Sequence, residues 1–138
     1  MINEEQISVV QSTWQSVVPI ADTAADLFYD RLFELDPSLR SMFPKEMGEQ
    51  KKKLLGTLGH LVSSLDNVEG VVPALQALGQ KHVGYGVQDS QYNTVGAALL
   101  WTLEKGLGDA WTAEAKDAWT AVYSLVSSVM IGAARKVG

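Results

Sequence analysis

The chain lacks cysteine altogether, has only two histidines and contains no long apolar run in its 138 residues. The absence of cysteine excludes disulfides, thiolate metal sites and cysteine nucleophiles. No stretch reaches the roughly 18 apolar residues that a membrane-spanning helix needs, so we expect no membrane insertion. The acidic start, Met1-Ile2-Asn3-Glu4-Glu5, does not follow the basic-then-apolar pattern of a secretory signal. We therefore expect a cytoplasmic protein.

Basic charge is also scarce. The net charge is −5 at pH 7 and the pI is about 4.9, which argues against nucleic acid as a partner. The hydrophobic content of 46% is ordinary for a globular domain. We find no internal repeat, linker or low-complexity tract, so residues 1–138 are expected to form a single domain.

Helical periodicity dominates what is present, and no segment reads convincingly as a strand. Asn3, Asp36, Ser90 and Thr112 are candidate helix N-caps, and prolines 19 and 37 stand where a helix can begin. The pattern predicts an all-α chain of about seven helices, at approximately 3–18, 20–35, 37–43, 47–66, a segment ending near residue 82, 90–107 and 112–135.

His82 is the most informative single residue. Val71, Leu75, Leu78 and His82 recur at helical spacing, so one apolar stripe carries all four. An imidazole in the interior must find a hydrogen-bond partner or coordinate a metal. Periodicity alone leaves both possibilities open, and a hydrogen-bonded core histidine is the commoner case.

Two further side chains mark possible polar positions in the interior. Tyr29 lies on the apolar face of the 20–35 segment, where its hydroxyl needs a partner. Gln50 heads a stripe of leucines, Leu54, Leu58, Leu61 and Leu65, at helical spacing. His60 falls off that stripe, so we expect it at the surface rather than as a ligand. The sequence has no Gly-x-Ser-x-Gly elbow, phosphate loop or His-Glu-x-x-His motif.

Together these features resemble the globin family, over nearly the whole chain from Trp14 onward. The markers are Asp36-Pro37 leading to Phe43, Gln50 followed by Lys53-Leu54, Leu78-Gly79-Gln80-Lys81-His82, Tyr92-Asn93-Thr94-Val95-Gly96, and Ala118-Trp119 with Tyr123. The sequence is most similar to single-domain bacterial haemoglobins, and it also resembles flavohaemoglobin haem domains and neuroglobin. The resemblance implies a globin fold around a pocket for haem b, iron protoporphyrin IX.

The resemblance also assigns roles to residues. His82 matches the proximal histidine that ligates haem iron, and Phe43 matches the phenylalanine that packs on the porphyrin. Lys53 matches a basic position that often pairs with a haem propionate, although a lone surface lysine is just as often only solvated. The pocket is expected to be lined by Leu54, Leu78, Val87, Tyr92 and Val95, each of which could otherwise be simply core.

On the side where the gas binds, the resemblance places Tyr29, Gln50 and Leu54. Oxygen held on haem iron carries partial negative charge, and a hydroxyl or amide donor in a low-dielectric pocket stabilises that charge. Carbon monoxide is much less polarised and gains less. We therefore expect the pair of donors to raise O₂ affinity mainly by slowing O₂ release.

The chain departs from flavohaemoglobins in two respects. Residues 1–138 contain no glycine-rich dinucleotide fingerprint, so a reductase is expected to be a separate protein. Flavohaemoglobins also carry a glutamate that bonds to the proximal histidine, and the matching position here is Ala134. An imidazole without a carboxylate partner donates less electron density, which weakens the case for peroxidase-like chemistry.

The leading expectation is reversible, high-affinity O₂ binding for storage or delivery. The alternative is nitric oxide dioxygenation, in which O₂ and NO give nitrate and a separate reductase restores ferrous haem. A gas sensor is a third reading, and a chain that takes up no haem would be an α-helical interaction module. The expected partners are O₂, with NO or CO as further ligands, and the chain is expected to be a monomer or a weak homo-oligomer.

Overall fold

The computed structural model describes the backbone of residues 3–43, 45–84 and 89–137, and their side chains except at positions 68, 81–84, 89–90 and 134–137. Every regular element in these ranges is helical, which confirms the predicted all-α class. The α-helices are α1 (Glu4–Val17), α2 (Ala21–Leu35), α3 (Gly48–Ser63), α4 (Val68–Gly84), α5 (Asp89–Leu107) and α6 (Ala113–Val137). Short 3₁₀ segments are η1 (Val18–Ile20), η2 (Pro37–Met42), η3 (Leu65–Asn67) and η4 (Gly108–Ala110).

Local signals placed most helix starts correctly. The Asn3 side chain accepts from the Gln6 N–H at 2.8 Å while the Gln6 side chain accepts from the Asn3 N–H at 3.0 Å, so both halves of the capping box form. Thr112 caps α6 by accepting from the Ala115 N–H at 3.1 Å. The prediction for Ser90 was wrong, because α5 already begins at Asp89 and Ser90 lies in its first turn.

Each of the seven predicted segments is helical, and the described ranges hold six α-helices together with short 3₁₀ segments. The predicted short helix after Asp36 is the 3₁₀ segment η2. Asp36 caps it by accepting from the Ser38 N–H at 3.1 Å, and Pro37 occupies its first position. The predicted 47–66 helix divides at Ser64 into α3 and η3. Such short, tight turns are common where a helix must end within a few residues.

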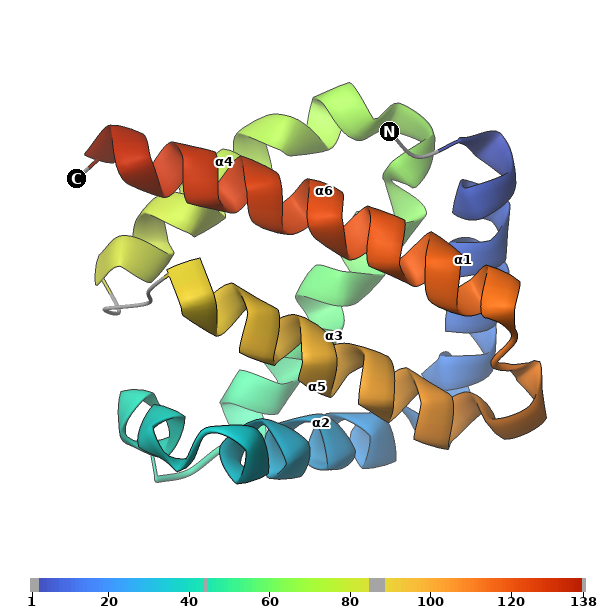
Figure 1. Ribbon diagram of the computed structural model, residues 1–138, viewed down its shortest axis with the longest axis horizontal. Coiled ribbons are helices and arrows are strands. Elements are labelled where there is room, and N and C mark those ends of the chain that lie inside the picture. The colour runs from blue at the N-terminus through green and yellow to red at the C-terminus, as the bar shows by residue number, and fades with distance from the viewer. Residues whose placement is uncertain (1–2, 44, 85–88, 138) are drawn as a thin grey trace.

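The helices cross one another around a common interior (Figure 1). The most extensive contacts join α4 to α6, α2 to α5 and α1 to α6. Gly79 allows α4 to approach α6 closely, because a Cβ built on it would lie 2.7 Å from the Met130 Cα. In the ribbon, α3 passes behind α5 and α6, and its buried residues Leu61 and Val62 belong to the common core cluster.

Two tryptophans pack together in the corner between α1 and α6. Trp119 is only 2% exposed, and its ring centroid lies 6.3 Å from that of Trp14. The Trp119 Nε1–H donates to the Thr13 hydroxyl at 2.8 Å. None of the helices in the described ranges is both long and apolar enough to cross a membrane.

Candidate functional site

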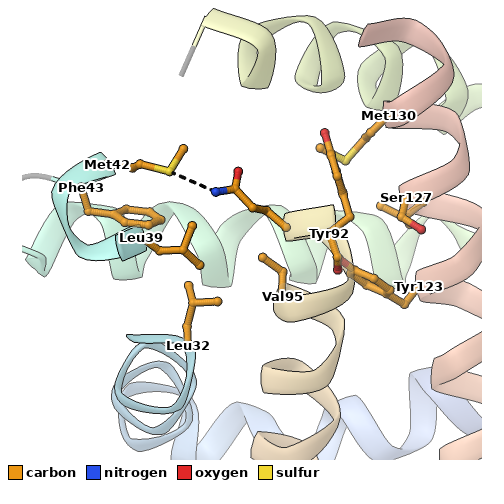
Figure 2. A pocket seen from close by; sticks show the side chains of 11 residues that line it. Leu32, Leu39, Met42, Phe43, Tyr92, Val95, Tyr123, Ser127 and Met130 are labelled. Carbon is orange, nitrogen blue, oxygen red and sulfur yellow. Dashed lines mark hydrogen bonds between the residues drawn. The ribbon is translucent and has the colours of Figure 1, made fainter. Parts of the chain in front are cut away.

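A cavity of about 160 Å³, the front cavity, opens between η2, α5 and α6. Figure 2 shows Leu39 and Phe43 on one side of it and Tyr123, Ser127 and Met130 on the other. Gln91 on α5 is tied to η2 by a long contact of 3.9 Å between its amide nitrogen and the Met42 sulfur. The lining is otherwise mostly apolar and comprises Leu32, Leu39, Met42, Phe43, Gln91, Tyr92, Val95, Tyr123, Val126, Ser127 and Met130.

A second cavity of about 90 Å³, the core cavity, adjoins the front cavity. Val95, Tyr123 and Val126 line both, so these side chains form the partition between them. The core cavity reaches further into the molecule and is lined by Phe28, Leu54, Thr57, Leu58, Leu61, Leu75, Leu78, Val95, Leu99, Trp119, Val122, Tyr123 and Val126. The two spaces therefore form one apolar region interrupted by a few side chains.

A hydrogen-bonded pair joins α2 to α3 beside aromatic side chains that line the two cavities. The Gln50 amide N–H donates to the Tyr29 hydroxyl oxygen at 3.3 Å. The Tyr29 ring, which is 4% exposed, makes edge contacts with Phe28 at 5.0 Å and Phe43 at 5.6 Å between centroids. Phe28 lines the core cavity and Phe43 lines the front cavity. Tyr29 therefore contacts one aromatic side chain of each cavity lining.

Burial keeps the Tyr29 hydroxyl protonated. Removal from water raises its pKa above the ordinary value of 10.0, and the hydrogen bond from Gln50 only partly opposes this. Because the hydroxyl oxygen accepts from Gln50, its own proton can point elsewhere. The arrangement provides a neutral donor at physiological pH.

The elements around the pair are anchored to one another. The Lys51 ammonium, on α3 beside Gln50, meets the Asp26 carboxylate of α2 at 2.6 Å. On the other side, the Arg40 guanidinium stacks 5.4 Å from the Phe33 ring centroid and donates to the Phe43 carbonyl at 3.3 Å. These contacts link the start of α3 and η2 to α2 on either side of Tyr29.

The structure brings together most of the residues singled out from the sequence. Phe43 and Tyr92 line the front cavity, Leu54 and Leu78 line the core cavity, and Val95 lines both. Tyr29 and Gln50 contact each other next to these spaces but line neither. Lys53 is exposed on α3.

The histidines differ in what can be said of them. His82 lies in the last turn of α4, one turn after Leu78, but its side chain is outside the described residues, as is the whole of Val87. His60 is exposed on α3, as expected for a residue off the leucine stripe.

Sequence reasoning missed the wall that α6 supplies. Tyr123, Val126 and Met130 of α6 line the front cavity, and they are spaced three and four residues apart in the sequence. The Tyr123 hydroxyl donates to the Tyr92 carbonyl, and burial is the main cause that raises the Tyr123 pKa, with Tyr92 adding to it. Gly96 leaves room for this ring, since a Cβ there would lie 2.7 Å from its Cε2. The helical spacing of the α6 residues was a usable signal.

The amino-acid sequence of this chain is similar to those of several known proteins. The family model described as Globin matches residues 26–130. A flavohemoprotein of Rhodopirellula baltica is 31% identical over 135 residues, covering 96% of this chain and 33% of the relative. The chain thus spans about a third of the flavohemoproteins it matches. A neuroglobin of Danio rerio is 29% identical over 143 residues, covering 94% of this chain and 90% of the relative.

Solved structures show the same architecture. A bacterial globin from Campylobacter jejuni superposes with a TM-score of 0.80 at 25% identity, covering 98% of both chains. An engineered carbene transferase from Rhodothermus marinus superposes with a TM-score of 0.87 at 23% identity, covering 99% of this chain and 96% of the other. At that identity the second likeness concerns the fold alone.

Proposed function

This chain belongs to the globin family, and on that premise we propose that it holds haem b in the front and core cavities and binds O₂ reversibly and tightly. The observation that carries the proposal is the Tyr29–Gln50 pair, which contacts the aromatic lining of both cavities. A polar pair with a donor to spare, next to an apolar space, suits a small ligand that carries partial negative charge.

The apolar region fits a flat, largely hydrophobic macrocycle. Neither cavity alone reaches the roughly 300–1,000 Å³ of a typical cofactor site, so the haem must extend across both and displace the side chains between them. Val95 and Val126 are only partly buried, which leaves them room to shift. Tyr123 is bonded to the Tyr92 carbonyl, so its ring would have to move with that bond broken or adjusted. The residues present therefore fit the group.

Five side chains would hold the haem by packing, one just after η2 and four on α3, α4 and α5: Phe43, Leu54, Leu78, Tyr92 and Val95. His82, one turn beyond Leu78 on α4, is the proposed iron ligand, because a neutral imidazole is the usual protein ligand for globin haem. Lys53 is exposed on α3 and is proposed to pair with a propionate. When bound, the haem supplies the iron that takes up O₂ and polarises it.

Tyr29 and Gln50 supply the selectivity among gases. The Tyr29 hydroxyl stays neutral because burial raises its pKa, so its proton is available for the partial charge on O₂. The Gln50 amide orients that hydroxyl by donating to its oxygen. A donor in a low-dielectric site favours a charged ligand over an apolar one, so O₂ should be retained longer relative to CO than in a pocket without donors.

The test begins with the absorbance spectrum of the purified protein after haem addition. We expect one haem per chain and a ferrous spectrum that changes reversibly on adding and removing O₂. Release of O₂ measured by stopped flow should be slow compared with release from the Tyr29→Phe variant. A protein that takes up no haem contradicts the proposal.

Nitric oxide dioxygenation is the second candidate, because several relatives that this chain matches are flavohemoproteins. The same Tyr29–Gln50 pair would hold O₂ while NO reacts with it to give nitrate. This use needs an electron supply, which we expect from a separate reductase. The deciding measurement is the rate of NO consumption with O₂ and an electron-donating reductase present, compared with the rate when the reductase is left out.

A further inference from the structure

The start of α3 has few of the features that usually fix the first turn of a helix. Its N-cap is Met47, whose side chain makes no capping hydrogen bond, and its first residue is Gly48. Glu49 is the favourable charge in this turn, but three lysines follow at positions 51–53. Positive charge close to the N-terminus of a helix is opposed by the helix dipole. The first turn of α3 therefore depends on contacts with the rest of the molecule.

Two side-chain contacts tie this turn to α2. The Gln50 amide N–H donates to the Tyr29 hydroxyl at 3.3 Å. The Lys51 ammonium lies 2.6 Å from the Asp26 carboxylate. Positions 50 and 51 are neighbours on α3, and positions 26 and 29 are three apart on α2, so one turn of each helix carries both contacts. The ion pair thus limits how far Gln50 can move away from Tyr29.

The ion pair also relieves a conflict of charge in each helix that it joins. On α2, the exposed carboxylates of Asp22, Asp26, Asp30 and Glu34 follow one another at steps of four. Like charges at this spacing repel one another. Lys51 offsets part of that repulsion, and Asp26 offsets the unfavourable positive charge of Lys51 near the start of α3. Both effects favour the closed ion pair.

We propose that Asp26 and Lys51 are positioning residues for the gas-binding pair. Their ion pair holds the first turn of α3, so that Gln50 keeps its hydrogen bond to Tyr29. The inference rests on the proposed gas-binding function and adds that an ion pair at the surface controls how long O₂ is retained. Neither Asp26 nor Lys51 lines the front or the core cavity. Their influence on the ligand must therefore pass through Gln50.

The first test does not involve gas binding. Amide hydrogen exchange of the purified protein reports how often the first turn of α3 opens. The Lys51 N–H, which donates to the Met47 carbonyl at 2.9 Å, is the amide to follow. In Asp26→Asn its exchange should become about two- to fivefold faster, the range expected when one partly exposed ion pair is lost.

Asp30→Asn is the matched control. It removes the same charge from an exposed carboxylate of α2, one turn beyond Asp26. Among the residues that the structure describes, Asp30 forms no ion pair. Exchange of the Lys51 amide should be no faster in this variant than in the parent chain. Equal acceleration by both variants would overturn the inference, because the net charge of α2 would then set the exchange.

The second test follows gas release by stopped flow. Asp26→Asn should release O₂ about two- to fivefold faster than the parent chain. Release of CO should change much less, because CO carries little charge for a donor to stabilise. In the Gln50→Leu background, Asp26→Asn should cause no further change in O₂ release, since both substitutions act through one side chain.

Exchanging the two charges separates positioning from a general effect on stability. Asp26→Lys alone places two cations against each other and should speed O₂ release more than Asp26→Asn does. Combining it with Lys51→Asp restores an ion pair of reversed direction, so O₂ release should return toward the parent rate.

The outcomes separate the inference from the function on which it rests. Unchanged O₂ release in Asp26→Asn, in a protein that binds haem and O₂ normally, overturns the inference and leaves the proposed function standing. Faster release that persists in the Gln50→Leu background, or that the exchange of charges does not reverse, also overturns it. A protein that takes up no haem overturns both.

Discussion

Two partly buried side-chain hydrogen bonds join helices in this protein. They differ in whether the accepting hydroxyl still has a proton to donate. In the corner of α1 and α6, Trp119 donates to Thr13 at 2.8 Å. The Thr13 hydroxyl itself donates to the Val9 carbonyl at 2.7 Å, so its proton and its oxygen are both used. Between α2 and α3, Gln50 donates to Tyr29 at 3.3 Å. In the described part of the chain, the Tyr29 proton has no acceptor.

This difference separates a bond that stabilises the fold from one that can serve a ligand. A saturated pair in a packed corner contributes only to stability. A pair that retains a donor beside an apolar space can give that donor to a bound molecule, where low dielectric strengthens the interaction. Changes to the two regions should therefore be read out by different measurements.

The largest effect should come from His82→Ala, which removes the proposed iron ligand and leaves the Trp119–Thr13 corner untouched. We expect the haem to be lost or weakly held, and the chain to melt at a lower temperature because ligand binding stabilises the native state. Absorbance and thermal unfolding check this. His60→Ala, which removes the exposed histidine, is the control and should keep the spectrum. An unchanged ferrous spectrum in His82→Ala would falsify the ligand assignment.

Tyr29→Phe comes next, because it keeps the ring and removes only the hydroxyl. A hydrogen bond to a charged acceptor is worth roughly 1.5–3 kcal/mol. Release of O₂ should therefore become about ten- to a hundredfold faster, while CO release changes much less. Stopped-flow release of both gases measures this. Equal effects on the two gases would mean that Tyr29 acts by shape rather than by donating a hydrogen bond.

Thr13→Val tests the other half of the comparison. It leaves the buried Trp119 N–H without its partner, which should lower the free energy of unfolding by about 1–3 kcal/mol. Because the corner retains no donor for a ligand, O₂ release should stay as in the parent chain. Chemical denaturation and stopped flow on the same sample check both points. A changed release rate would show that the two regions are coupled.

Gln50→Leu should have a smaller effect than Tyr29→Phe in the same direction, because Gln50 is proposed to orient the donor. The double variant with Tyr29→Phe should speed O₂ release by less than the product of the single effects, since residues in one network are not additive. Strictly multiplicative effects would indicate two independent contacts with the ligand.

The smallest effect expected is that of pH. Burial raises the pKa of Tyr29 above its ordinary value of 10.0, so the hydroxyl remains protonated as pH rises from 7 toward that value. The unfolded chain loses this proton at its ordinary pKa while the folded chain keeps it, so stability from this group is full below that pH and is lost above it. O₂ release should stay flat from neutral pH to about 9.5, a half unit below that ordinary tyrosine pKa. A step within this range would place another titrating group beside the ligand.

The amino-acid sequence by itself determined the helices and most of their ends. An α-helix is stabilised by contacts three and four residues apart, so caps such as Asn3 with Gln6 and stripes such as that of α3 are visible in it. The predicted cap at Ser90 falls one residue inside α5, and the predicted short helix after Asp36 is the tighter 3₁₀ segment η2. Periodicity placed Tyr29 and Gln50 each on an apolar face, and only the family resemblance predicted that the two act as a pair.

Only the tertiary structure decided which side chains of different helices contact one another. Tyr29 meets Gln50 across 21 residues, and Trp119 meets Thr13 across 106. The two cavities exist, with the α6 wall of Tyr123 and Val126 between them, because helices far apart in the chain cross one another there. Periodicity says which face of a helix is buried, but a cavity is the space that several faces leave between them, and no local pattern records that space.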